Sequence, residues 1–103
     1  MSTFFVGRHR SAVKWIKAKR IHVDVWTDDL DPNTVKPGDT VIGTLPLHLA
    51  SKVCRRGAVF AAMTMDIPKA QRGKELMLDD IEKCRCRLEA FNVTPIPLPP
   101  GLS

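Results

Sequence analysis

Two short β-rich runs end at a glycine and lead directly into segments with helical spacing. Residues 3–6 are closed by Gly7, and residues 40–42 are closed by Gly43. Short runs of apolar and β-branched residues are typical of strands that are buried in a parallel sheet. A helix directly after such a strand begins a strand–helix–strand unit, which few architectures accommodate. These two runs therefore favour an α/β fold, with the second run as a central strand.

Three segments have apolar residues three or four positions apart, which predicts amphipathic helices. They are residues 11–20, 47–56 and 77–91. Ser11 is expected to cap the first helix, because a serine side chain can accept a bond from an amide of the first turn. Gly57 is expected to end the second helix.

Two further strands complete the pattern. Residues 21–26 alternate apolar and polar side chains, as an edge strand with one buried face does, whereas residues 58–65 are apolar throughout and predict a fully buried strand. Residues 27–39 contain acidic residues and prolines and predict a surface connection with turns. The order predicts a compact α/β sandwich with a mostly parallel sheet of about four or more strands and about three helices.

Length and charge limit the classes of protein. A chain of 103 residues leaves no room for a second core, so we expect one domain over residues 1–91 and a proline-rich, extended or disordered tail over 92–103. The 16 Lys and Arg against 11 Asp and Glu give a net charge of +5, which favours an anionic partner. The chain lacks an apolar stretch long enough to span a bilayer and a signal-peptide pattern, so we expect a cytoplasmic protein with no membrane partner.

The cysteines and tryptophans favour packing roles. Cys54, Cys84 and Cys86 have no CxxC spacing, so neither a disulfide framework nor a metal site is expected, and no cofactor. On the predicted third helix, Cys84 and Cys86 face different directions and serve as packing and surface residues. Trp15 and Trp26 could stack on bases, but core packing is the stronger interpretation in a chain with 6% aromatic residues.

The turns after the two glycine-closed strands are the first places to look for a ligand. In an open parallel sheet, ligands bind beyond the carboxyl ends of strands whose crossovers leave toward opposite faces. Residues 7–11 place two arginines, an imidazole and a hydroxyl beside a helix N-terminus, which favours phosphate. In residues 43–46, glycine permits close backbone approach, and Thr44 can cap or donate its hydroxyl. A solvated basic turn and simple capping would also explain these residues.

The remaining polar residues have unequal weight. His9 suits proton transfer or phosphate contact, His22 has no expected role, and His48 is as consistent with the surface as with the crevice. Beyond Asp66, a loop around Gly73 could close over an anion or could be an ordinary solvated loop. Its basic residues are Lys69, Arg72 and Lys74, of which Arg72 is the strongest candidate.

Several segments together resemble the small CRISPR-associated accessory proteins of type III systems, which have a CARF-like, Rossmann-like fold. The segments are FVGRH at 5–9, Ala12 with Trp15-Ile16, PGDTVIGTLP at 37–46, RGA at 56–58, DIP at 66–68 and RGKEL at 72–76. The resemblance covers residues 3–91, and residues 37–46 make it specific. It implies a ring nuclease that binds and linearises cyclic oligoadenylate, with cyclic tetra-adenylate as the expected ring, and so switches off the antiviral response.

The resemblance also implies a mechanism and site residues. A ribose 2′-hydroxyl attacks the adjacent phosphate without a metal, in a homodimer whose turns lie at the axis. The implied catalytic residues are His9, Arg8 and Thr44, and the implied ligand-binding residues are Gly7, Arg10, Ser11, Gly43, Leu45, Pro46 and Arg72.

Two departures from the family pattern leave a second possibility open. Serine is usual in the family where Gly7 stands, and a proline-glycine pair where Arg10 and Ser11 stand, so Ser11 or Thr44 would have to supply the missing hydroxyl. A non-catalytic binder of cyclic oligoadenylate is the alternative. A general nucleic-acid-binding module fits less well, because the chain lacks the paired strand aromatics of an RRM and a GXXG clamp, and no stable DNA partner is expected.

Overall fold

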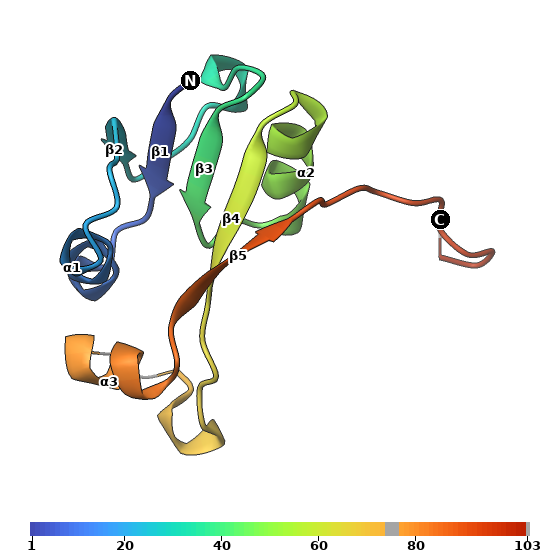
Figure 1. The fold of residues 1–103 in the computed structure, drawn as a ribbon. Coiled ribbons are helices and arrows are strands. Elements are labelled where there is room, and N and C mark those ends of the chain that lie inside the picture. Colours follow the sequence, from blue (N-terminus) through green and yellow to red (C-terminus); the bar gives the residue numbers. More distant parts are fainter. Residues whose placement is uncertain (74–76, 103) are drawn as a thin grey trace.

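A five-stranded sheet forms the centre of the molecule, with helices against both of its faces (Figure 1). The computed structural model describes residues 1–73 and 77–102. The strand order is β2-β1-β3-β4-β5, with β1 to β4 parallel and β5 antiparallel to β4. The strands are β1 (Thr3–Val6), β2 (Val25–Thr27), β3 (Thr40–Gly43), β4 (Val59–Thr64) and β5 (Arg87–Phe91). The predicted α/β fold with a mostly parallel sheet is confirmed.

The helices divide between the two faces of the sheet. They are α1 (Arg10–Ala18), α2 (Leu47–Arg55) and α3 (Leu78–Lys83), with short 3-10 turns at Pro32–Thr34 and Lys69–Gln71. The core on the side of α1 and α3 contains Phe5, Trp15, Ile16, Ile42, Met63 and Ile81. The core on the side of α2 contains Phe4, Val6, Val41, Ala50, Val53 and Phe60, among others. Successive strand residues therefore face opposite cores, because side chains alternate across a sheet.

The chain leaves the sheet in opposite directions after β1 and β3. From β1 it passes through α1 to β2, and from β3 it passes through α2 to β4 on the other side. The helices α1 and α2 also pack on opposite faces. The topological switch point, where the connections leave the sheet in opposite directions, therefore lies between β1 and β3. The two predicted ligand turns begin there, at the edge of the sheet where these strands end.

The predicted third helix over residues 77–91 is wrong in its second half. The helix α3 ends at Lys83, Arg85 has a positive φ of 56°, and the chain then returns as β5. Leu88 lies opposite Met63 of β4 and packs against the core beside α1. Pairing satisfies the hydrogen-bonding groups along β4, so this tertiary demand overrides the helical spacing of the apolar residues. Cys84 and Cys86 consequently lie in the turn before β5 and not on a helix, with Cys84 buried and Cys86 half-buried.

Two expectations about burial also need correction. The strand β2 is at the sheet edge as predicted, but it comprises only Val25–Thr27. Trp26 is 41% exposed, although the sequence favours a core position for it, whereas Trp15 is buried as expected. The strand β4 is not fully buried, because Val59 is 46% exposed. Val59 lies at the amino end of β4 and faces the side of α1 and α3. Those helices lie toward the carboxyl ends of the strands, away from Val59 (Figure 1).

The chain after β5 is extended. Residues 92–102 form neither helix nor strand and run away from the sheet (Figure 1). At the start of this segment, the Val93 amide donates to Sγ of Cys54 at 3.4 Å, and Val93 packs against the core beside α2. In the part of the chain that the structure describes, no helix has the length and apolar character to cross a membrane.

Candidate functional site

The carboxyl ends of three strands are aligned at one edge of the sheet. Val6 of β1 pairs with Thr27 of β2 and with Gly43 of β3, so all three strands end at the same level. The Gly7 amide then donates to the Thr27 carbonyl at 3.0 Å. The turns after β1 and β3 therefore start side by side, as the sequence predicted, and the turn after β2 joins them.

The two glycines at this edge have different surroundings. Gly43 has a φ of 149°, and a Cβ there would lie 2.3 Å from the Val6 carbonyl oxygen. The close backbone approach expected at Gly43 exists, but the approaching group is the protein's own neighbouring strand. A Cβ at Gly7 would lie 3.0 Å from a ring carbon of Phe5, a tight contact with a side chain.

The helix α1 begins differently from the prediction. Its N-cap is His9, whose carbonyl accepts from the Val13 amide at 3.2 Å, and Ser11 lies in the first turn. The first turn contains no acidic residue. The expected capping role of Ser11 is therefore wrong, because the chain enters the helix two residues earlier. The partial positive charge of the helix start is thus adjacent to Arg8 and Arg10, and no acidic side chain of the first turn offsets it.

The turn after β3 is mainly structural in character. Pro46 is the N-cap of α2, so Thr44, two residues earlier, does not cap the helix. Leu45 is buried in the core beside α2, whereas Thr44 and Pro46 are exposed. No acidic residue stands in the first turn of α2. His48, in that turn, is exposed.

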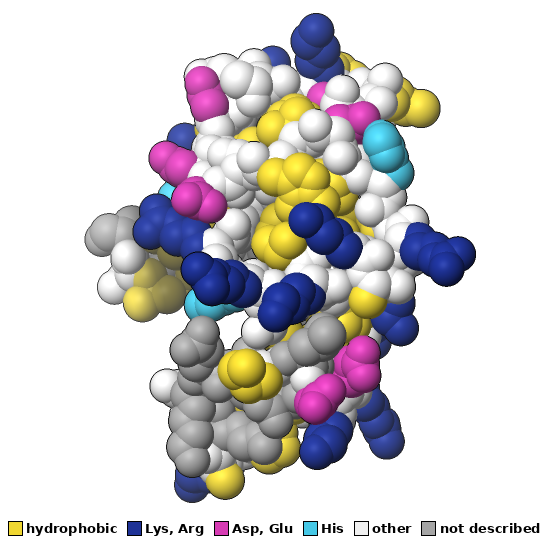
Figure 2. All heavy atoms as spheres, turned by 90° about the vertical axis from the view of Figure 1, so that its left-hand side faces the viewer, with side chains coloured by type: hydrophobic (Ala, Val, Ile, Leu, Met, Phe, Trp, Pro, Cys, Tyr) yellow, Lys and Arg dark blue, Asp and Glu magenta, His cyan; other side chains and the backbone are white. Residues whose placement is uncertain are grey.

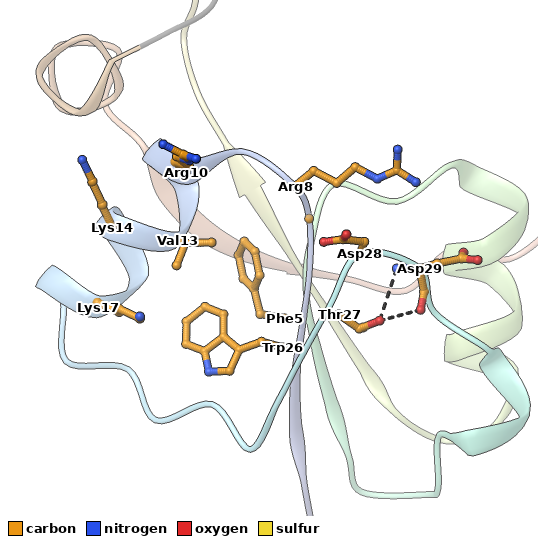
Figure 3. Close-up of a pocket in the computed structure, with 11 residues that line it drawn as sticks. Phe5, Arg8, Arg10, Val13, Lys14, Lys17, Trp26, Thr27, Asp28 and Asp29 are labelled. Atoms are coloured by element: carbon orange, nitrogen blue, oxygen red, sulfur yellow. Dashed lines mark hydrogen bonds between the residues drawn. The ribbon is translucent and has the colours of Figure 1, made fainter.

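A cavity of about 850 Å³ opens beside the turn after β1, between α1 and the end of β2 (Figure 3). Of the predicted site residues, Gly7, Arg8 and Arg10 line it. The other lining residues are Phe5, Val13, Lys14, Lys17, Trp26, Thr27, Asp28 and Asp29. The predicted residues outside the lining are His9 and Ser11 in the adjacent turn, Gly43, Thr44, Leu45 and Pro46 in the turn after β3, and Arg72 in the loop after β4.

Aromatic rings form the middle of this cavity. Phe5 is 1% exposed, and its ring centroid lies 5.3 Å from that of Trp26 with the ring planes inclined by 46°. Nζ of Lys17 lies 5.4 Å from the centroid of the Trp26 ring, in a cation–π arrangement. Figure 2 shows this face of the molecule, with hydrophobic side chains at its centre and Lys and Arg side chains around and over them.

The charged groups lie on two sides of the rings. Arg10, Lys14 and Lys17 come from α1, whereas Asp28 and Asp29 follow β2 on the opposite side, with Arg8 above them (Figure 3). Thr27 fixes the acidic turn, because its Oγ1 donates to the Asp29 carbonyl at 2.7 Å and accepts from the Asp29 amide at 3.2 Å.

Sequence reasoning missed the residues contributed by β2. The alternating pattern of residues 21–26 predicts an edge strand, but it specifies neither the neighbour of this strand nor its direction. If the strand is parallel and adjacent to the first strand, its carboxyl end must lie at the edge where the turns after β1 and β3 begin. This placement brings Trp26, Asp28 and Asp29 to Arg8. The acidic residues after residue 26 were the available signal.

Asp66 and His22 have structural partners, and the basic residues of the loop after β4 are exposed where the structure describes them. Asp66 pairs with Arg87 at 3.5 Å, and its amide donates to the Cys84 carbonyl at 2.7 Å. His22 contacts the Asp24 carboxylate at 2.8 Å. Arg72 and Lys69 are exposed, and Lys74 lies outside the described residues. Within residues 1–73 and 77–102, no group of three His, Cys, Asp or Glu side chains is placed to hold a metal ion.

Fold and site together define an open α/β protein with a basic, aromatic-centred cavity at its switch-point edge. A family model described as "Putative CRISPR-associated protein (Cas_VVA1548)" matches residues 4–94. The chain therefore belongs to this CRISPR-associated family, which confirms that part of the resemblance found in the sequence. Comparison with the curated proteins and with the solved structures gives no match.

Proposed function

We propose that this protein is a ring nuclease that binds and linearises cyclic oligoadenylate, above all cyclic tetra-adenylate, and so ends type III CRISPR signalling. The observation that carries the proposal is the cavity at the switch-point edge, where Arg8 and Arg10 stand beside the start of α1. Guanidinium groups and helix N-termini both favour phosphate. Membership of a CRISPR-associated family and the net charge of +5 support an anionic ligand of that defence system.

The proposed assembly is a symmetric homodimer with a CARF-like arrangement. A cyclic tetranucleotide has twofold symmetry and four phosphates, so two copies of one basic edge match it. The turns after β1 and β3 of each protomer would face each other across the axis. Light scattering with and without cyclic tetra-adenylate tests this: a dimer is expected, and monomer under both conditions contradicts it.

The proposed reaction is an internal transfer at phosphorus. The ribose 2′-oxygen forms a bond to the adjacent phosphorus, the bond from phosphorus to the 5′-oxygen breaks, and the products carry a 2′,3′-cyclic phosphate and a 5′-hydroxyl. The proton of the 2′-hydroxyl leaves to a base, and the 5′-oxygen takes up a proton. His9 exchanges a proton or orients the phosphate, Arg8 and Arg10 stabilise the developing charge, and Thr44 donates a hydrogen bond. Arg72 closes on the ring from its loop. No bond in this scheme requires a metal ion.

Incubation with cyclic tri-, tetra- and hexa-adenylate, followed by chromatography, tests the proposal. Cyclic tetra-adenylate should yield linear fragments ending in 2′,3′-cyclic phosphate at the same rate with and without chelator. The analogue without 2′-hydroxyls should bind and resist cleavage. Full cleavage of that analogue, or activity lost on chelation and restored by a divalent ion, contradicts the mechanism.

A non-catalytic binder is the second candidate, and one observation favours it. Gly7 brings no hydroxyl to the turn after β1, and Thr44 does not line the cavity. Tight binding of cyclic tetra-adenylate without product formation would establish this function in place of the nuclease. Affinity for unrelated RNA or DNA with a steep salt dependence would instead indicate a general nucleic-acid-binding module.

A further inference from the structure

We propose that the cavity beside α1 is a nucleobase subsite, in which Trp26 stacks on one adenine of the ligand and Asp28 accepts a hydrogen bond from its amino group. The inference rests on the proposed function for the identity of the ligand. It adds which part of the ligand enters the cavity and what selects it.

Trp26 is presented for stacking by the residues around it. It is 41% exposed, whereas Trp15 is 4% exposed. The ring of Phe5, itself 1% exposed, lies 5.3 Å from the Trp26 ring, so one side of the indole rests on a rigid part of the core. An indole held in place before binding loses little freedom when a base stacks on it.

The cations of α1 form a row beside the indole. Arg10, Lys14 and Lys17 are four and three residues apart, a spacing that places them along one helix face, and all three line the cavity. Nζ of Lys17 already stands over the Trp26 ring. A base that stacks on this face displaces the exposed Lys17 side chain toward the phosphates of the ligand. The row therefore marks the phosphate side of the subsite.

The carboxylates mark the opposite side. Asp28 and Asp29 would repel a phosphate, so the group of the ligand that meets them must donate hydrogen bonds. The exocyclic amine of adenine is such a donor, whereas hypoxanthine and uracil have a carbonyl in the equivalent place. Thr27 holds the turn through its two bonds to Asp29, and Figure 3 shows Asp28 nearer to the aromatic rings than Asp29. The geometry thus favours Asp28 as the residue that selects an amino-bearing base.

The first test uses tryptophan fluorescence. The chain has two tryptophans, so Trp15→Phe leaves Trp26 as the only indole. Cyclic tetra-adenylate and adenosine monophosphate should both quench its emission. Trp26→Ala should weaken binding of cyclic tetra-adenylate about tenfold to hundredfold, Trp26→Phe should retain most of the affinity, and Trp15→Phe should leave it unchanged. Circular dichroism establishes that each variant is folded.

The second test addresses selection of the base. The wild-type protein should bind adenosine monophosphate more tightly than inosine monophosphate, and Asp28→Asn should reduce this preference about tenfold, because an amide both donates and accepts. Asp29→Asn is the matched control, since it removes the same charge one residue away. An equal loss of preference in both variants would mean that general charge, and not Asp28, sets it.

The outcomes separate this inference from the proposed function. If the wild-type protein binds no cyclic oligoadenylate but adenosine monophosphate quenches Trp26, the ring nuclease proposal is wrong and the subsite stands. If cyclic tetra-adenylate binds while Trp26 emission and the affinity of Trp26→Ala stay unchanged, the subsite is overturned and the proposed function is not.

Discussion

The parallel strands begin at one edge of the sheet, the amino edge, and end at the other, the carboxyl edge. These two edges use charge in opposite ways. At the amino edge, acidic side chains bind backbone amides: Asp39 accepts from the amides of Ser2 and Lys36 at 2.8 and 2.9 Å, and Asp24 accepts from the Thr3 amide at 2.8 Å. At the carboxyl edge, Arg8 and Arg10 line a cavity and form no ion pair with the described residues. Charge at the first edge fixes the fold, whereas charge at the second is available to a ligand.

Gly43→Ala should have the largest effect, because it breaks the carboxyl edge without changing a charge. The new Cβ would lie 2.3 Å from the Val6 carbonyl, and the φ of 149° is strained for any side chain. The expected cost is about 4 kcal/mol or more, enough to leave little folded protein. Urea denaturation measures it. A stability close to wild type would show that β1 and β3 can separate at this edge.

His9→Ala should remove most of the cleavage and little of the fold. His9 is exposed at the N-cap of α1, and its side chain makes no capping bond. If the imidazole transfers a proton, the single-turnover rate on cyclic tetra-adenylate should fall about 100-fold or more with the dissociation constant nearly unchanged. Equal losses in rate and affinity would assign His9 to phosphate binding alone.

Arg8→Ala should weaken ligand binding and leave stability intact, in contrast to the acids of the other edge. Loss of one charged hydrogen bond should cost roughly 1.5 to 3 kcal/mol, or about 10- to 150-fold in the dissociation constant for cyclic tetra-adenylate at fixed salt. Lys36→Ala, at the amino edge, is the control for a lost positive charge and should bind like wild type. A lower melting temperature for Arg8→Ala would move Arg8 to a structural role.

The contrast between the edges was only partly visible in the sequence. The strand-closing glycines and the basic turn at residues 7–11 are local patterns, so the placement of the turns after β1 and β3 at one edge of the sheet could be predicted from them. The bond between the Ser2 amide and Asp39 could not be predicted, because the two residues lie 37 positions apart in the chain. The cavity depends likewise on where β2 joins the sheet, which no local pattern specifies. Residues 87–91 mislead for a related reason: their apolar spacing suits a helix, and only the partner strand β4 determines the extended form.

Acid should weaken the amino edge selectively. The Ser2 and Lys36 amides hold the pKa of Asp39 below its usual 3.8, and the Thr3 amide and then His22 hold the pKa of Asp24 below the same value. Both carboxylates therefore stabilise the folded state fully above pH 3.8, and this contribution is lost as the pH falls through the lowered native values. Melting temperatures between pH 6 and pH 2 measure the loss. Asp39→Asn should lower the melting temperature at pH 6 and flatten its fall in acid, and a fall as steep as in wild type would contradict the assignment.

Gly7→Ser should change the stability of the fold only a little and bears most directly on catalysis. The Cβ would meet the Phe5 ring at 3.0 Å, so the ring must shift by a few tenths of an ångström, which should cost about 1 kcal/mol or less because the φ of Gly7 lies outside the left-handed region. The serine also places a hydroxyl beside Arg8. If the wild-type protein cleaves slowly for lack of that group, Gly7→Ser should raise the single-turnover rate, whereas Gly7→Ala should not. Equal rates for both variants would mean that the turn needs no hydroxyl at position 7 and that the basic groups of the carboxyl edge suffice.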